Sequence, residues 1–206
     1  MLVLGVTGQS GAGKGAFCDI MREKGIECLD TDKTAREVVE PGTECLSELV
    51  KHFGTGILNE DGSMNRKKVA SIVFSDKNEL EFLTKTTHKY IIEKIKIWLL
   101  ERELNGDKIV IIDAPQLFDA GADFYCNFKL CVLADKTVRI NRIMSRDGIT
   151  EETARARIES QNDDEFFRER CEYTVYNNKD VAALRKCADR VYCDLMSKKE
   201  YFDDEF

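Results

Sequence analysis

Residues 8–14 read Gly-Gln-Ser-Gly-Ala-Gly-Lys, which matches the phosphate-binding pattern G-x-x-x-x-G-K. The segment before it, residues 1–7, is a nearly unbroken apolar run that predicts a strand buried on both faces. In the residues that follow, apolar side chains recur at helical spacing at Phe17, Ile20 and Met21. A strand, a glycine-rich turn and a helix in this order predict a loop that binds a nucleoside triphosphate.

Each part of this loop has a physical role toward phosphate. The glycines let backbone N–H groups turn toward phosphate oxygens without clashes from a Cβ atom, and the positive end of the following helix points to the same place. Lys14 adds a charge that can reach the β- and γ-phosphates. A tight strand-to-helix connection without a ligand is the alternative, and the lysine disfavours it. The expected ATP-binding residues of the loop are Gly8, Ser10, Gly11, Ala12, Gly13, Lys14, Gly15 and Ala16.

The chain departs from the full motif directly after the lysine. Gly15 stands where Ser or Thr is expected, and that hydroxyl normally binds Mg²⁺. The sequence therefore predicts the class of ligand, a nucleoside triphosphate, but leaves open which groups hold the metal.

Composition fits a compact enzyme of 206 residues, with 43% hydrophobic and 33% charged residues. The net charge of −7 argues against a general nucleic-acid binder, and no apolar run approaches the roughly 20 residues that span a bilayer. Nothing at the N-terminus resembles an export signal.

The eight cysteines include no C-x-x-C pair, which disfavours a zinc site. We therefore expect reduced thiols and a cytoplasmic protein.

Strand and helix patterns alternate along the chain. Further strands are predicted at 26–30, 108–113, 128–133 and 172–176, followed by a helix from about residue 180. This alternation predicts a three-layer α/β fold with a parallel sheet of about five strands and helices on both faces. The long helical stretch between the second and third strands is broken by turn signals at Pro41-Gly42 and residues 59–62, so we interpret it as an inserted substrate-binding region.

Three carboxylates follow predicted strands. Asp30 and Asp32 close the second strand and Asp113 closes the third. Ligands of open parallel sheets bind outside the carboxyl ends of the strands, where a carboxylate can orient metal-bound water or accept a proton. The alternative is that these residues cap the helices that follow them.

A pair of helices with arginines is predicted after the fourth strand. Arg142 and Arg146 are four residues apart and share a helix face, and a turn at residues 147–150 separates them from a second helix. Such a helix pair suits a lid that neutralises triphosphate charge. The alternative is a solvated helix pair in which Glu151 and Glu152 provide ion-pair partners.

With these motifs the chain resembles dephospho-coenzyme A kinases. The resemblance extends from Gly5 to about Asn177 and follows the family order of motifs. Its segments are residues 5–14, 29–32 with Ala35-Arg36, 38–42, 53–62, 72–74, 115–119, Arg142 to Asp147, and Gln161.

The resemblance implies transfer of phosphate from ATP to the ribose 3′-hydroxyl of dephospho-coenzyme A, giving coenzyme A and ADP. It implies a P-loop kinase core at 1–32, 107–137 and 171–206, a coenzyme-binding insertion at 33–106 and a lid at 138–170. The expected partners are these two small molecules, with neither nucleic acid nor membrane. The roles implied by position are catalysis by Asp32, Lys14 and Arg142; ATP binding by Arg142 and Arg146; substrate binding by Asp32, Arg36 and His88; and support of Mg²⁺ through water by Asp30, Asp32 and Asp113.

Two alternatives stay open. Gly15-Ala16 replaces the usual Ser-Thr, which leaves a non-catalytic nucleotide-binding regulator as one alternative, and the other is a kinase of another small nucleotide or nucleoside, which the inserted region would distinguish. Lys89 follows His88 where the family has proline, and this departure leaves the role of His88 open. The sequence leaves the oligomeric state open, and it predicts that the acidic tail, residues 201–206, frays.

Overall fold

The computed structural model describes residues 1–204 and the side chains of residues 1–198. Its strands are β1 (Leu2–Gly8), β2 (Glu27–Asp30), β3 (Ile109–Asp113), β4 (Phe128–Leu133) and β5 (Tyr173–Tyr176). Its helices are α1 (Lys14–Arg22), α2 (Thr31–Glu37), α3 (Glu44–Phe53), α4 (Arg66–Val73), α5 (Lys77–Leu104), α6 (Lys136–Asp147), α7 (Glu151–Glu159), α8 (Asp164–Arg168) and α9 (Val181–Asp204), with 3₁₀ turns η1 (Thr55–Ile57) and η2 (Ala122–Tyr125).

The strands form one sheet in the order β2-β3-β1-β4-β5, and the pairings of β1 with β3, β1 with β4 and β4 with β5 are parallel. The predicted α/β fold with a five-stranded parallel sheet is confirmed. Every residue of β1 is buried, because this central strand has a neighbour on each side and helices on both faces. Parallel strands run in the same direction, so the loops that follow β1, β3 and β4 all lie at the carboxyl ends of the strands.

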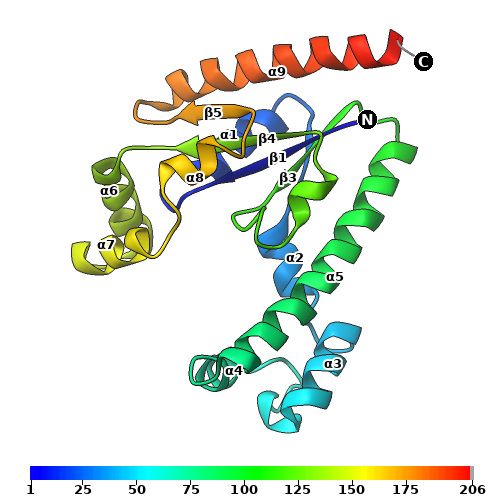
Figure 1. Cartoon of the computed structure of the whole chain (residues 1–206), viewed down its shortest axis with the longest axis vertical. Helices are drawn as coiled ribbons and strands as arrows, with labels where there is room; N and C mark the ends of the chain where they lie inside the picture. Colours follow the sequence, from blue (N-terminus) through cyan, green and yellow to red (C-terminus); the bar gives the residue numbers. More distant parts are fainter. Residues whose placement is uncertain (205–206) are drawn as a thin grey trace. The chain divides into compact units, whose positions relative to one another are not determined.

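Helices α1 and α9 cover one face of the sheet (Figure 1). One core cluster contains Leu4 of β1, Phe17 of α1 and Leu195 of α9, and each of these residues has a relative exposure of 0%. Burying an aliphatic or aromatic side chain of this size contributes about 1.5–3 kcal/mol each. This packing fixes the start of α1, and therefore the loop before it, against the rigid centre of the sheet.

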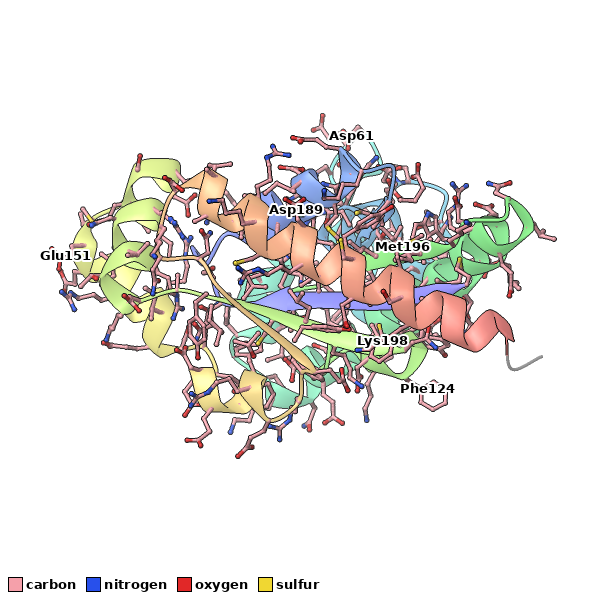
Figure 2. All side chains as sticks on the ribbon, turned by 90° about the horizontal axis from the view of Figure 1, so that it is seen from above. Asp61, Phe124, Glu151, Asp189, Met196 and Lys198 are labelled. Atoms are coloured by element: carbon pink, nitrogen blue, oxygen red, sulfur yellow. The ribbon has the colours of Figure 1, made fainter. Side chains whose placement is uncertain are left out.

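α9 also contacts the edge of the sheet through its polar side chains. Figure 2 labels Asp189, Met196 and Lys198 along this helix. The Lys198 ammonium donates a hydrogen bond to Tyr173 Oη at 2.7 Å and lies 4.7 Å from the centre of the Phe128 ring. These contacts join α9 to β5 and β4. The opposite face of the sheet carries a smaller cluster in which Cys131 and Leu133 pack with Phe167 of α8.

α6 and α7 form a helix pair beyond the carboxyl end of β4, with Glu151 at the start of α7 (Figures 1 and 2). Gly148 ends α6 in the left-handed conformation, with φ of 64°, and the Thr150 side chain caps α7. Ile143 and Ala154 are fully buried in a small core between the two helices. The pair is thus stabilised by a core of its own.

Contacts divide the chain into two units, residues 1–29 with 102–206 and residues 30–101. The second unit contains α2 to α4 and most of α5. Gly42, with φ of 87°, lies in the turn before α3, and the Gly62 N–H donates to the Asn59 carbonyl in the turn before α4. Within this unit the His52 ring stacks on Phe82 with centroids 3.6 Å apart, which joins α3 to α5. Both breaks expected in the inserted region are therefore turns.

The prediction for the N-terminal end of the chain is confirmed, whereas the prediction for the C-terminal end is wrong for most of its residues. The strand at the N-terminus forms as predicted. At the other end α9 continues to Asp204, so a helix occupies most of the tail that the sequence predicts to fray, and residues 205–206 lie outside the described part. Among the helices that the structure describes, none combines the length and apolar character needed to cross a membrane.

Candidate functional site

The loop between β1 and α1 has the backbone shape that phosphate binding requires. Gly13 precedes α1 with φ of 98°, a conformation that side chains other than glycine rarely adopt. A Cβ atom at Gly13 would also overlap the side-chain nitrogen of Asn177. The Ala12 N–H donates to the Gln9 carbonyl at 3.1 Å, which closes the turn inside the loop. Glycine at position 13 is therefore required both by the turn and by its neighbour.

Side chains from outside the loop bind three consecutive carbonyl groups. Arg139 Nε donates to the Ser10 carbonyl at 3.0 Å, and Arg142 Nη1 donates to the carbonyls of Gly11 and Ala12 at 3.3 Å each. Asn177 Nδ2 adds a 2.8 Å bond to Ala12 O. In a trans peptide the N–H points away from the C=O of the same unit. Holding these carbonyls outward therefore turns the N–H groups of Gly11 and Gly13 to the other side, where a phosphate would bind.

Lys14 and Asp113 form an ion pair beside this loop. Asp113 is the last residue of β3 and pairs in register with Val6 of β1, so the sheet itself places the carboxylate near the start of α1. Asp113 is 5% exposed. The sequence predicts Lys14 and Asp113 as site residues separately, and the structure brings them into contact.

The two arginines that the sequence places in a lid lie in different surroundings. Arg142 binds the loop carbonyls, whereas Arg146 donates to Asp147 through Nε at 2.7 Å and Nη2 at 3.0 Å. Arg157 contacts the same carboxylate. Hydrogen bonds from Arg146 and Arg157 hold the pKa of Asp147 well below its usual range. Arg146 is exposed and faces its own turn, so its predicted contact with ATP stays a prediction.

The residues expected near the acceptor lie in the second unit or at its border. Asp30 Oδ1 accepts from the N–H groups of Asp32 and Lys33 at 2.9 and 3.1 Å, which is the capping role that the sequence leaves open as the alternative. Asp32 and Arg36 are exposed on α2, and His88 is half-buried on α5. Their predicted roles toward the substrate stay predictions.

A pocket of about 260 Å³ lies within the second unit. Val38, Cys45, Tyr90 and Ile97 contribute to its wall. The buried Cys45 thiol has its pKa raised to about 11, because burial disfavours the thiolate. This unit therefore offers a largely apolar cavity to part of a ligand.

A magnesium ion suits the oxygen donors that the chain offers. Mg²⁺ is usually bound by one or two carboxylates together with phosphates and waters, rather than by a complete protein cage. Within residues 1–204, the structure contains no group of three or more His, Cys, Asp or Glu side chains able to hold a metal. The carboxylate of Asp113, next to Lys14 at the loop, is one such single donor. The donor set fits an ion bound mainly through phosphate and water.

The sequence predicts no role for three residues that hold the loop in shape. They are Gln9, which belongs to the loop, and Arg139 and Asn177, which lie outside it. Arg139 precedes Arg142 by three residues on the same helix, and that spacing was the one available signal. Asn177 directly follows β5 and reaches the loop only because β5 and β1 are separated by a single strand.

Comparison with known proteins identifies relatives along nearly the whole chain. A family model described as dephospho-CoA kinase matches residues 2–183. The dephospho-CoA kinase of Corynebacterium efficiens is 34% identical over 198 residues, covering 96% of this chain and 99% of that protein. The Corynebacterium glutamicum dephospho-CoA kinase is 35% identical over 195 residues, covering 95% and 100%. A crystal structure from Thermus thermophilus aligns with a TM-score of 0.76 at 27% identity, covering 94% of this chain and 97% of the other.

Proposed function

The chain belongs to the dephospho-coenzyme A kinase family, and from this premise we propose that it transfers the γ-phosphate of ATP to the ribose 3′-hydroxyl of dephospho-coenzyme A. The products are coenzyme A and ADP, and the reaction is the last step of coenzyme A synthesis. The observation that carries the proposal is the phosphate loop with Lys14 in place, within a family match that covers residues 2–183.

ATP binding uses the loop backbone and Lys14. The carbonyls of Ser10, Gly11 and Ala12 are bound from outside, so the loop is already shaped before the nucleotide arrives. A preorganised set of donors needs no reorganisation when charge develops on the phosphoryl oxygens, which is a large source of rate enhancement. Lys14 neutralises charge on the β- and γ-phosphates once it exchanges Asp113 for a phosphate oxygen.

The transfer itself moves one proton and one phosphoryl group. The acceptor's 3′-oxygen forms a bond to the γ-phosphorus while the bond to the bridging oxygen of ADP breaks. By the family resemblance, Asp32 accepts the hydroxyl proton, as a carboxylate does in other kinases. Arg142 stabilises the charge that accumulates during transfer, and Arg146, Arg36 and His88 contribute to binding ATP and the acceptor.

Mg²⁺ is the divalent ion that we propose for this enzyme. When bound, it would neutralise charge on the triphosphate. Because Gly15 and Ala16 have no hydroxyl, ATP oxygens and waters would hold the ion, supported by carboxylates, with Asp113 as the first candidate and Asp30 and Asp32 as the others. We also propose a cytoplasmic location, which is supported by eight cysteines that are all free thiols.

The test is ADP release with a panel of acceptors in the presence of ATP and Mg²⁺. Dephospho-coenzyme A should be required, and AMP and CMP should be poor acceptors. If AMP or CMP were used better than dephospho-coenzyme A, a nucleotide kinase would be the correct description. If ATP bound but no acceptor released ADP at any Mg²⁺ concentration, the chain would be a non-catalytic nucleotide-binding regulator.

A further inference from the structure

Arg139 is the most deeply buried arginine near the phosphate loop, with 3% of its surface exposed. It lies on α6, and its guanidinium group donates three hydrogen bonds. Their acceptors are Ser10 O at 3.0 Å, Gln9 Oε1 at 2.7 Å and Gln161 Oε1 at 3.0 Å. All three acceptors are neutral oxygens, and two of them belong to the loop.

The same network joins the loop to the segment that follows α7. Gln161 Oε1 also accepts from the Ser10 N–H at 3.1 Å, and Gln9 Nε2 donates to the Asn162 carbonyl at 2.9 Å. The Arg139 guanidinium therefore lies between the outer side of the loop and residues 161–162. The backbone packs equally closely, since a Cβ atom at Gly11 would lie 2.8 Å from the Arg139 carbonyl oxygen.

The charge of Arg139 needs an explanation, because a buried cation is costly unless an anion accompanies it. None of the ion pairs among the described residues includes Arg139. Burial lowers the pKa of its guanidinium, and Asp164 acts against this shift only through space. Neutral hydrogen-bond donors could hold Ser10 and Gln9 at less cost. A polyphosphate bound on the inner side of the loop would supply a second anion in addition to the Asp164 carboxylate.

We propose that Arg139 is a positioning residue whose buried positive charge strengthens polyphosphate binding through the loop, in addition to holding Ser10 in place. This inference rests on the proposed function only in taking ATP as the ligand. A charge acting from behind the backbone should favour ligands in proportion to their negative charge. ATP should therefore gain more than ADP, whereas a purely structural contact would affect both nucleotides alike.

Gln161→Glu gives the sharpest test because it changes charge while retaining geometry. A carboxylate oxygen at position 161 can accept from both Ser10 and Arg139, so the network survives and the loop keeps its shape. The new negative charge offsets that of Arg139. We expect the midpoint of thermal unfolding to stay the same or rise, while the Kd for ATP increases about tenfold and the Kd for ADP increases less.

Asn162→Asp is the matched control, since it adds the same charge one residue further, where only the backbone carbonyl joins the network. It should leave both Kd values within about twofold of the wild type, because residues 161 and 162 are both exposed but only the side chain at 161 bonds directly to Arg139. Two further variants separate charge from shape. Arg139→Lys should keep more ATP affinity than Arg139→Gln, since lysine keeps the charge but not the planar set of donors.

Nucleotide Kd values are measured calorimetrically without acceptor, so the outcome does not depend on the identity of the substrate. A folded Gln161→Glu protein that binds ATP as the wild type does would overturn the proposal. Equal losses for ATP and ADP would reduce Arg139 to a structural residue. If the affinities shift as expected but dephospho-coenzyme A is not phosphorylated, the inference stands and the proposed function fails.

Discussion

The Lys14 ammonium group contacts the Asp113 carboxylate, although 99 residues separate the two in the chain. Their side chains are 16% and 7% exposed, so the pair is largely shielded from water. An incoming triphosphate must compete with Asp113 for the lysine. The pair therefore keeps Lys14 at the loop, where we expect a phosphate oxygen to replace Asp113 as its partner.

Lys14→Ala should weaken ATP binding and turnover together. The change removes the cation that we propose to reach the β- and γ-phosphates, and it takes the ammonium partner away from the Asp113 carboxylate near an anionic ligand. We expect kcat to fall about 100-fold or more, the scale seen when one charge-stabilising donor is lost. ATP Kd from calorimetry and kcat from ADP release provide the two measurements.

Asp113→Asn is the complementary variant, since it retains the shape of the side chain but removes the charge. ATP binding without Mg²⁺ should be unchanged or tighter, because the competitor for Lys14 is gone. Turnover with Mg²⁺ should fall, because the carboxylate that we propose to support the hydrated ion is lost. Normal turnover at low Mg²⁺ would show that Asp113 serves only as the partner of Lys14.

Asp32→Asn should lower turnover by roughly two to four orders of magnitude, the range usual for a general base, while ATP binding remains normal. Asparagine keeps the size of the side chain but cannot accept the hydroxyl proton. Glu37→Gln, an exposed carboxylate on the same helix 3.7 Å from Lys33, is the matched control and should be fully active. Near-normal turnover of Asp32→Asn would remove this residue from the mechanism.

The sequence predicts the sheet well because its strands are encoded locally. The apolar runs at 108–113 and 128–133 become β3 and β4 with bounds that agree within one residue, since a strand buried on both faces needs such a run. The loop is equally predictable, because its glycines and lysine are adjacent in sequence. The end of α9 is harder to predict, since an acidic helix terminus carries little periodic signal.

The contacts that complete the loop could not be predicted in the same way. Asn177 and Arg139 reach residues that precede them by 165 and 129 positions, and nothing local in the chain encodes those distances. The role of Asp30 was ambiguous for a different reason. A carboxylate at a strand end and an N-cap of the next helix have the same local sequence, and only the bonds to Asp32 N and Lys33 N identify the cap.

Arg142→Ala should lower turnover more than ATP affinity. Arg142 binds the carbonyls of Gly11 and Ala12 at 3.3 Å each, longer than the bonds by which Arg139 holds Ser10 and Asn177 holds Ala12. The loop can therefore keep these shorter bonds while Arg142 turns to a phosphate oxygen. A lid arginine acts most on the charge that develops during transfer, so kcat should fall about 100-fold while the Kd for ATP changes little.

Arg155→Ala is the control for the same helix pair, because Arg155 forms an exposed ion pair with Glu151 inside α7. It should behave as the wild type. If Arg142→Ala lost ATP affinity but kept its kcat, the residue would only shape the loop. If neither quantity changed, the bonds of Arg142 to the loop would be dispensable both for ATP binding and for transfer.

Gly15→Ser should lower the Mg²⁺ concentration required for half-maximal rate without changing the choice of acceptor. The substitution restores the hydroxyl that phosphate loops of this kind normally offer to Mg²⁺. The backbone permits it: Gly15 lies in the first turn of α1 and is absent from the glycines with positive φ. Apart from its chain neighbours and the backbone of α1, a Cβ atom there would meet no heavy atom within 4 Å.

Gly15→Ala separates the hydroxyl from the backbone effect of the same substitution. Alanine within a helix is favoured over glycine by about 0.5–1 kcal/mol, and alanine adds no metal ligand. The Mg²⁺ requirement should therefore fall for serine and stay at the wild-type value for alanine. Equal shifts for both variants would mean that helix stability sets the requirement. A wild type that already saturates at low Mg²⁺, with serine no better, would mean that carboxylates and waters hold the ion as well as a hydroxyl would.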